Sequence, residues 1–338
     1  MRTEEFDYPL PPEAIAQEPA NPRDSSRLLV LDRFTGEIHE DIFRQVADYL
    51  RPGDVLALND TRVIPARLHG RRPTGGRCEV FLLRDLGEGR WEALVRPARR
   101  LKPGAEVLIG EVRLKVLERT PEGTRVVKFP SREAAERVLE EHGQVPLPPY
   151  IKRPLHDPER YQSVFARSPG STAASTAALH FTEGLIERLR QKGVRVVWFT
   201  LHMGLGSFRP IRVEEVEQHR LPPEVYTLPP ETASEVNRAK AEGRRVIACG
   251  TGAVRVLEGV AAEGGRLRAG SGMVDLFIMP GYRFRVVDGM ITNFHLPRSS
   301  HLVLVSAFAG RDLVMRAYSW ALERGFRFLS FGDAMLIL

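Results

Sequence analysis

The sequence predicts an α/β protein whose α/β part is interrupted by a small all-β segment. Apolar runs at residues 54–59 and 194–202 have the pattern of buried strands, the second nearly continuous, as in a strand buried on both faces. From residue 182 onward, helical and strand patterns alternate, as they do in α/β domains. Between residues 67 and 130, short strand-like runs are separated by Gly- and Pro-containing turns, which is typical of a small barrel or sandwich.

The N-terminal part leads from proline-rich loops into the first buried strand. We expect a strand at residues 28–32 and a short helix at 42–50, before the buried strand at 54–59. That strand runs into the polar residues Thr61, Arg62 and Arg67. Because open α/β sheets bind ligands at strand ends, these side chains are candidate substrate contacts. The alternative is a domain-crossing segment whose arginines are solvated.

The all-β segment carries a basic cluster on one of its loops. Arg96, Arg99, Arg100 and Lys102 indicate either a nucleic-acid contact or an ordinary solvated charge run. An amphipathic helix is expected at residues 131–142. The proline-rich residues 143–154 then form an extended return linker, and we expect Tyr150 to line a cleft between the two domains.

The central stretch, residues 170–182, is rich in small and hydroxyl-bearing residues and ends in His180, Phe181 and Thr182. Small residues let a ligand approach the backbone, and hydroxyls donate or accept hydrogen bonds. Thr182 is a candidate N-cap for a helix that Gly193 ends. His180 and Phe181 therefore precede a helix N-terminus, which favours polar or anionic ligands. A small-residue turn packed under a helix is the alternative.

The remaining chain places polar residues after several strands. The strand at 194–202 ends at His202 and the glycine-rich residues 203–209, and a strand at 245–249 is followed by Gly250, Thr251 and a helix at 253–262. A strand–glycine–helix turn binds anions or ribose, or is required by packing alone. We also expect a helix at 231–242, a strand at 275–279, helices at 302–310 and 312–324, and a strand at 326–333 ending on Asp333.

Composition restricts the class of protein. There are 49 basic and 43 acidic residues, and the net charge of +6 is compatible with a polyanionic partner. Cys78 and Cys249 are the only cysteines, which fits a reducing cytoplasm, and no apolar run is long enough to span a membrane. Metal, Walker and serine-elbow motifs are absent, so we expect no metal site and no hydrolase.

With these segments assembled, the chain resembles the S-adenosylmethionine:tRNA ribosyltransferase-isomerases of queuosine biosynthesis. The resemblance runs nearly end to end and includes Asn59-Asp-Thr-Arg-Val-Ile-Pro-Ala-Arg-Leu, Leu179-His-Phe-Thr, His202-Met-Gly-Leu-Gly-Ser-Phe-Arg-Pro and Ile291-Thr-Asn-Phe-His-Leu-Pro. It implies an α/β catalytic domain (residues 1–66 and 143–338) with a mixed or parallel sheet, interrupted by an antiparallel β-barrel (67–142). The chain departs from the family pattern at Ser175, Ala178, Gly252, Val274, Met279 and Phe331.

The resemblance also implies the reaction. S-adenosylmethionine would donate its ribosyl group to the aminomethyl group of a 7-deazaguanine base at the tRNA wobble position. Epoxyqueuosine would form, and adenine and methionine would be released. No prosthetic group is implied, because S-adenosylmethionine is a co-substrate. We expect a cytoplasmic monomer that binds tRNA and no membrane.

Such a reaction needs a general base, a proton donor for adenine and stabilisation of the opened sugar oxygen. We expect His180 to be the acid/base, with Thr182 and Ser171 as hydroxyl partners and His202 as a further catalytic group. The expected substrate contacts are Thr61, Arg62, Arg67, Tyr150, Thr176, Phe181, Gly204, Gly206, Arg209, Gly250, Thr251, Arg255, Asp275, Asn293, His295, Arg298 and Asp333.

Two other classes of function compete with this one. A conventional S-adenosylmethionine-dependent RNA methyltransferase would have an acidic residue two positions before its Gly-x-Gly, where this chain has Ala248 and Cys249. A non-catalytic RNA-binding protein would explain the barrel and the charge, but not polar loops on several strand ends.

Overall fold

The computed structural model describes residues 1–204, 210–261 and 264–338. The chain divides into two compact units. Unit 1 consists of Met1–Thr61, Pro148–Ser168 and Ala174–Leu338, and unit 2 of Arg62–Leu147 and Pro169–Ala173. The predicted fold class, an α/β domain interrupted by an antiparallel barrel, is confirmed.

Unit 1 contains a nine-stranded mixed sheet with the strand order β16-β14-β13-β3-β15-β17-β18-β1-β2. The central strands β13, β3, β15 and β17 are mutually parallel, whereas β18 runs antiparallel to β17 and β1 is parallel to β18. The strand bounds are β1 Arg27–Leu31, β2 Ile38–Ile42, β3 Val55–Asn59, β13 Arg195–His202, β14 Glu224–Leu228, β15 Val246–Cys249, β16 Gly270–Val274, β17 Gly289–Asn293 and β18 Ala334–Ile337.

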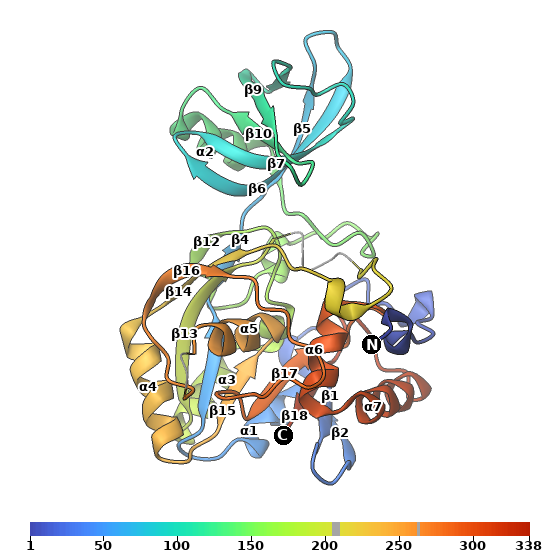
Figure 1. Cartoon of the computed structure of the whole chain (residues 1–338), viewed down its shortest axis with the longest axis vertical. Helices are drawn as coiled ribbons and strands as arrows, with labels where there is room; N and C mark the ends of the chain where they lie inside the picture. The colour runs from blue at the N-terminus through green and yellow to red at the C-terminus, as the bar shows by residue number, and fades with distance from the viewer. Residues whose placement is uncertain (205–209, 262–263) are drawn as a thin grey trace. The chain divides into compact units, whose positions relative to one another are not determined.

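Helices cover both faces of this sheet (Figure 1). The connection from β3 to β13 and that from β13 to β15 run in opposite directions along the sheet, and right-handed crossovers then place their helices on opposite faces. The helices are α1 Val46–Tyr49, α3 Glu183–Gln191, α4 Pro230–Ala241, α5 Thr251–Gly259, α6 Ser300–Ala309 and α7 Arg311–Glu323, with short 3₁₀ turns at η1 Thr3–Phe6, η2 Pro12–Ala14, η3 Arg23–Ser25, η4 Phe43–Gln45, η5 Pro158–Tyr161, η6 Thr176–His180 and η8 Val216–Gln218.

The strand directions decide where polar loops gather. Parallel strands β3, β13, β15 and β17 all end at one edge of the sheet. Because β18 and β1 run the opposite way, the residues that precede them, Asp333 and Ser26, lie at that same edge. We call it the carboxyl edge. In α/β sheets this edge is where ligands bind.

Unit 2 is a six-stranded antiparallel barrel. The sheet has the strand order β11-β5-β6-β7-β10-β9-β8, and a further pairing of β5 with β8 closes the ring of the six strands from β5 to β8. Strand β11 is a seventh strand, which pairs with β5. Alternate residues of β9 are buried and exposed, as a barrel wall requires. The bounds are β5 Arg67–Arg71, β6 Arg77–Gly87, β7 Arg90–Arg96, β8 Glu106–Ile109, β9 Val112–Arg119, β10 Arg125–Lys128, α2 Arg132–His142 and β11 Gly143–Gln144; β4 Thr61–Val63 and β12 Ser168–Ser171 form a separate two-stranded sheet.

Three predictions about strands were wrong. Residues 326–333 form a loop that precedes β18, because Leu329 has a φ of 70° and the rings of Phe326 and Phe328 pack on Phe294 instead of alternating across a sheet. Residues 275–279 follow β16 without forming a strand of their own. Strand β13 is not buried on both faces, since Val196 and Trp198 are only half-buried against the core.

The predicted helix at residues 42–50 is shorter than expected: β2 includes Ile42, and the helical turns begin at Phe43. The helix that follows Gly250 spans Thr251–Gly259, so it begins two residues earlier than predicted and ends before residue 262, which lies outside the described residues. The buried strand at residues 54–59, the amphipathic helix at 131–142, the helix capped by Thr182 and the short barrel strands were predicted correctly.

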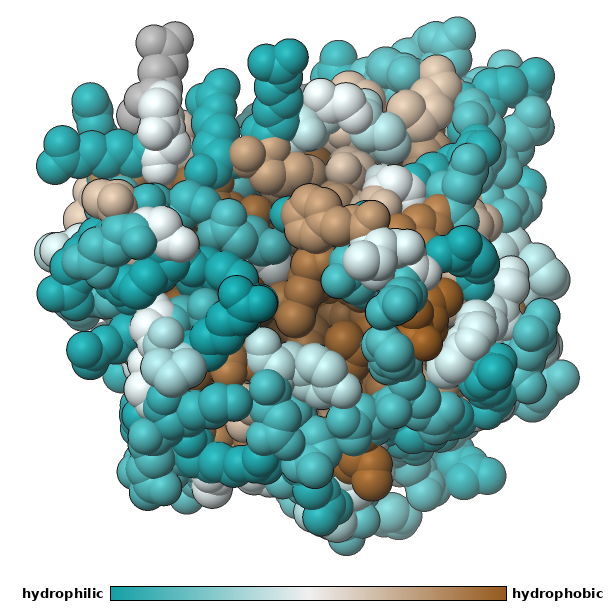
Figure 2. All heavy atoms as spheres, turned by 90° about the horizontal axis from the view of Figure 1, so that it is seen from below, coloured by the Kyte–Doolittle hydropathy of each residue, from teal (hydrophilic) through white to brown (hydrophobic). Residues whose placement is uncertain are grey.

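The surface seen in Figure 2 is mainly hydrophilic around a central area where apolar side chains gather. Among the described residues, the large hydrophobic side chains classed as exposed are Met1, Phe34, Ile42, Leu117 and Met273. No helix in the described part of the chain is both long and apolar enough to cross a bilayer.

The predicted N-cap of α3 gives a direct test of the local structure. The Thr182 hydroxyl accepts the backbone N–H of Leu185 at 3.1 Å. We expect Thr182→Ala to lower the free energy of unfolding by about 1 kcal/mol, because one helical N–H loses its acceptor. Urea denaturation would measure this, with Thr182→Ser as a control that retains the hydroxyl. Equal losses in both variants would contradict the capping role.

Candidate active site at the carboxyl edge of the unit 1 sheet

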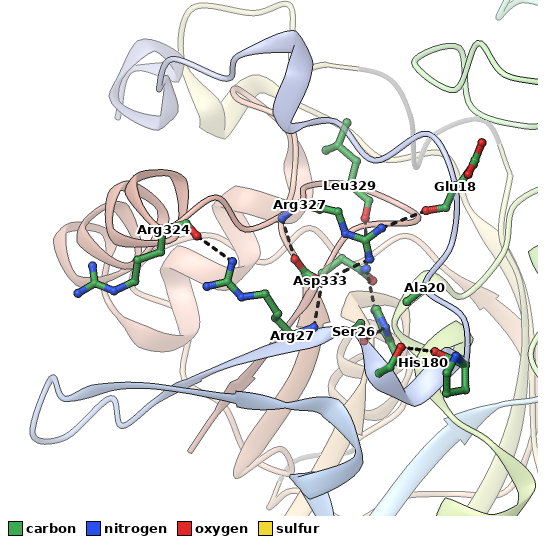
Figure 3. A network of polar contacts seen from close by, with 12 residues as sticks. Glu18, Ala20, Ser26, Arg27, His180, Arg324, Arg327, Leu329 and Asp333 are labelled. Carbon is green, nitrogen blue, oxygen red and sulfur yellow. Dashed lines mark hydrogen bonds and ion pairs between the residues drawn. The ribbon is translucent and has the colours of Figure 1, made fainter.

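His180 is buried at the end of η6, with both ring nitrogens hydrogen-bonded (Figure 3). Nε2 lies 3.1 Å from the side-chain amide nitrogen of Asn293, and Nδ1 lies 2.7 Å from the Ser26 hydroxyl. An amide nitrogen only donates, so Nε2 accepts and the ring proton is on Nδ1, which donates to Ser26. Burial, together with the charges of Arg327 and Arg23, lowers the pKa of His180 to about 3. The ring is therefore neutral at physiological pH.

Asn293 ends β17, and its amide has one defined orientation. Nδ2 donates to the Leu329 carbonyl at 3.2 Å as well as to His180, and only an NH₂ group can make both contacts. The amide oxygen Oδ1 is buried and has no hydrogen-bond partner among the described residues. An acceptor buried without a donor costs free energy, and a ligand N–H or O–H would satisfy it.

Both carboxylate oxygens of Asp333 accept hydrogen bonds from the backbone at this edge. Its carboxylate accepts the backbone N–H groups of Arg27 at 3.0 Å and Arg327 at 2.7 Å (Figure 3). The side chain is almost completely buried. It joins the start of β1 to the loop before β18, and this use of both oxygens leaves it poorly suited to the substrate contact that was predicted.

A second polar group lies where β3 and β13 end. The Asn59 side chain accepts the N–H groups of Leu201 and Thr61 and donates to the Leu201 carbonyl. It thereby holds the two strand ends together, and the Thr61 hydroxyl lies 2.8 Å from Nδ1 of His202.

The side chain of His202 is more exposed than that of His180. It is half-buried, and its Nε2 has no hydrogen-bond partner among the described residues. Burial lowers the pKa of His202, while Asp60 acts in the opposite direction. Asp60 in turn accepts from the Thr200 hydroxyl at 2.6 Å and from Nε of Arg167 at 2.7 Å. His202 is therefore a neutral imidazole with one nitrogen available.

The central stretch lies against the strand–glycine–helix turn. Gly250 has a φ of 87°, and a Cβ atom there would lie 3.4 Å from the Ser175 hydroxyl. Glycine is required by this backbone conformation. In the described part of the chain, no side chain caps α5, which begins at Thr251, so the first turn of the helix is without a side-chain acceptor there. Ser175, which precedes η6, and Ala177 within it are thus neighbours of the α5 N-terminus.

Arg255 forms a buried ion pair where a substrate contact was predicted. Nη1 lies 2.7 Å from Oε2 of Glu224, and Oε1 of Glu224 accepts the N–H of Gly204 at 3.0 Å. Nη2 of Arg255 is buried without a partner among the described residues. The pair fixes Gly204 next to α5, so Arg255 positions this segment and is not an open cation.

The other predicted residues are dispersed. Tyr150 donates to or accepts from the Ser330 hydroxyl at 2.7 Å, and burial raises its pKa to about 12. His295 contacts the Thr292 hydroxyl through Nε2 at 2.8 Å, and burial lowers its pKa. Phe181 is fully buried in the core, Arg298 pairs with Asp7, and Asp275 is exposed after β16. Ser171, Arg62 and Arg67 belong to unit 2, and Gly206 and Arg209 lie outside the described residues.

Several residues at this edge were missed by the sequence analysis, namely Ser26, Asn59, Asp60 and Glu224. Asn59 and Asp60 directly follow a buried strand, so position alone was a signal for them. Nothing local marks Ser26 or Glu224, whose partners are 154 and 31 residues away. No group of His, Cys, Asp and Glu suited to a metal ion occurs in the described part of the chain.

The burial of His180 predicts a pH dependence of stability. An unfolded histidine titrates near pH 6.5, whereas the folded pKa is about 3, so below pH 6.5 the unfolded chain binds a proton that the folded chain does not. As the pH decreases below 6.5, this residue should lower the free energy of unfolding by up to about 1.4 kcal/mol per pH unit. Urea unfolding at decreasing pH should give a shallower dependence for His180→Gln, which has no titrating ring. Equal slopes would contradict the assignment.

The similarity of this chain to known proteins extends over nearly its whole length. The family model described as "Queuosine biosynthesis protein" matches residues 3–337. The S-adenosylmethionine:tRNA ribosyltransferase-isomerases of Desulfitobacterium hafniense and Symbiobacterium thermophilum are 51% and 52% identical, over 100% of this chain and of each relative. The crystal structure of S-adenosylmethionine tRNA ribosyltransferase from Thermotoga maritima is similar with a TM-score of 0.57 and 42% identity, covering 99% of this chain and 100% of that one. The chain belongs to the queuosine biosynthesis protein family.

Proposed function

We propose that this chain is an S-adenosylmethionine:tRNA ribosyltransferase-isomerase. It transfers and isomerises the ribosyl group of S-adenosylmethionine onto 7-aminomethyl-7-deazaguanine at the tRNA wobble position, giving epoxyqueuosine, adenine and methionine. The observation that carries this function is the full-length identity of about half with relatives that have this name. The polar carboxyl edge of unit 1 supports it, since parallel sheets bind small substrates there.

The chemistry sets the groups that the site must supply. The positive sulfonium acidifies the neighbouring C5′ protons of the ribose, and a base that removes one starts the opening of the sugar and the loss of adenine. The acceptor amine then bonds to the sugar carbon, the ring recloses as a carbocycle, and epoxide closure expels methionine. A base, a proton donor and hydrogen-bond donors for developing oxyanions are therefore needed.

We assign the base to His202 in preference to His180. When the Thr61 hydroxyl donates toward the Ser168 carbonyl, 3.5 Å away, its oxygen accepts Nδ1–H of His202, and Nε2 then has a free lone pair. His180 has no such free nitrogen, because Ser26 and Asn293 occupy both. A lowered pKa keeps His202 in its basic form at neutral pH.

His180 then acts as a positioning residue. It fixes the Asn293 amide so that Oδ1 remains directed away from His180 and Leu329, available to an N–H or O–H of S-adenosylmethionine. The first turn of α5 at Gly250 and Thr251, with Ser175 beside Gly250, would receive a polar or anionic group of the same substrate. The hydroxyls of Thr182 and Ser171 serve a helix cap and a turn, in which Ser171 donates to the Ala173 carbonyl.

A product assay tests the reaction. The purified protein is incubated with adenosyl-labelled S-adenosylmethionine and a tRNA carrying the aminomethyl-deazaguanine, or with the same tRNA unmodified. We expect free adenine, and ribosyl label on the modified tRNA alone. S-adenosylhomocysteine and methylated RNA would indicate a methyltransferase instead. Absence of turnover with both tRNAs would favour a binding protein.

The two histidines can be distinguished by their pH profiles. We expect His202→Gln to lower kcat by roughly 10²- to 10⁴-fold, the usual contribution of a general base. Its pH–rate profile should lose the acidic limb, which in the wild type lies below about pH 6.5 because the pKa of His202 is lowered. Thr61→Ser, which retains the hydroxyl beside Nδ1, is the matched control.

We expect His180→Asn to lower kcat/KM while the acidic limb remains, because a positioning residue does not titrate in this range. Measurement of kcat/KM between about pH 5 and 8 for both variants decides between the roles. Loss of the acidic limb in His180→Asn, with the limb retained in His202→Gln, would return the acid/base role to His180.

A further inference from the structure

The net charge of the protein is located in unit 2. Residues 62–147 contain 18 of the 49 basic residues and 12 of the 43 acidic ones, and residues 169–173 carry no charge. Unit 2 therefore has a net charge of +6, the value of the whole chain. The rest of the chain has 31 residues of each sign. A barrel of this size has no structural need for such an excess, which favours a polyanionic ligand.

Within the barrel, four exposed cations lie within seven residues at the end of β7 and in the loop that follows it. We call residues 96–102 the basic loop: Arg96, Arg99, Arg100 and Lys102 are all exposed, and no acidic residue occurs from Arg96 to Ala105. None of the four forms an ion pair with the described residues, although Glu79 is the cross-strand neighbour of Arg96. Four arginines elsewhere in the barrel are ion-paired, namely Arg84 with Glu92, Arg90 with Glu88, Arg113 with Glu106 and Arg132 with Glu136.

A buried arginine holds the basic loop in place. Arg125 is only 6% exposed, and its guanidinium donates to the carbonyls of Leu101 at 3.0 Å and Ala98 at 3.2 Å. Nη1 donates to the carbonyls of Gly123 and Thr124, both at 3.0 Å. The side chain of Leu101 is fully buried and anchors the loop from the other side.

The groups that accept hydrogen bonds from Arg125 affect the electrostatic potential of the basic loop. A buried charge is tolerated when its donors are satisfied, and here carbonyls satisfy them without a carboxylate. The loop is therefore fixed by a group that adds to its positive potential and does not cancel it. Fixing a loop before binding removes part of the entropy cost of association.

We propose that the basic loop is a docking surface of the barrel unit for the phosphate backbone of tRNA. This inference rests on the proposed function, which supplies tRNA as the polyanion. Arginine guanidinium binds phosphate oxygens in a bidentate manner, and three of the four exposed cations are arginines. Contacts of this type are independent of base sequence and position the RNA.

The test uses the full-length protein and an unmodified tRNA transcript, whose binding requires no turnover. The loop variant is Arg99→Gln, Arg100→Gln and Lys102→Gln combined. The matched control is Arg90→Gln, Arg113→Gln and Arg132→Gln combined, which removes the same charge from the same barrel at residues that are ion-paired. Dissociation constants are measured by fluorescence anisotropy over a series of salt concentrations.

We expect the loop variant to bind tRNA about ten-fold or more weakly at 0.1 M salt, because three phosphate contacts are lost. The plot of log affinity against log salt should become shallower by about 2, since each contact contributes about 0.7 to 0.9. The control should retain most of the wild-type affinity and slope. Loop and control variants with the same affinity and slope would overturn the proposal.

Arg125→Lys tests the clamp separately, because it conserves the charge and removes the fork that spans Ala98 and Leu101. We expect KM for tRNA to rise in this variant although the net charge is unchanged, with the circular dichroism spectrum of the wild type retained. A wild-type KM in a folded Arg125→Lys variant would show that the clamp does not position the loop.

The outcomes separate the docking surface from the reaction. If adenine is released but KM for tRNA is the same in the loop variant and the control, the docking surface is wrong and the reaction stands. If no tRNA supports adenine release but the loop variant alone binds tRNA weakly, the reaction is wrong and the docking surface stands.

Discussion

The common direction of β3, β13, β15 and β17 is the constraint on which the candidate site depends. Because these strands are parallel, their carboxyl ends and the loops that follow them meet at one edge. Segments that are far apart in the chain, such as those around Asn59, His202, Gly250 and Asn293, thus become neighbours in one layer. An antiparallel arrangement would have divided the same residues between two edges.

Buried polar links then hold this edge together. Asn59 joins β3 to β13, His180 joins Ser26 to Asn293, and Asp333 joins the backbone at Arg27 and Arg327. Most of their donors and acceptors are satisfied, as expected for buried polar groups. Among the described residues, Oδ1 of Asn293 has no hydrogen-bond partner, and neither does Nη2 of Arg255 at the same edge. Such exceptions are more informative about ligand binding than the satisfied groups are.

Charge is distributed differently in the two units. Unit 1 is neutral overall, and its site relies on neutral imidazoles, amides and hydroxyls. Unit 2 has the entire positive excess, with a loop whose cations lack acidic partners among the described residues. Reaction of a sulfonium substrate requires no net positive charge at the site, whereas binding of a nucleic acid benefits from it at the surface.

Sequence alone determined the features that depend on local periodicity and capping. The buried run at 54–59, the helix that Thr182 caps and the short barrel strands were all predicted, because each is a repeating pattern within a few residues. The polar strand ends were also identified, and they indicated the edge of the sheet at which we propose the site. Only the tertiary structure decided what each polar residue does. Ser26 and Asn293 form hydrogen bonds with both ring nitrogens of His180, and Glu224 forms an ion pair with Arg255. Residues 326–333 form a loop because distant aromatic rings pack there. These outcomes depend on partners distant in sequence, and no local pattern specifies such partners.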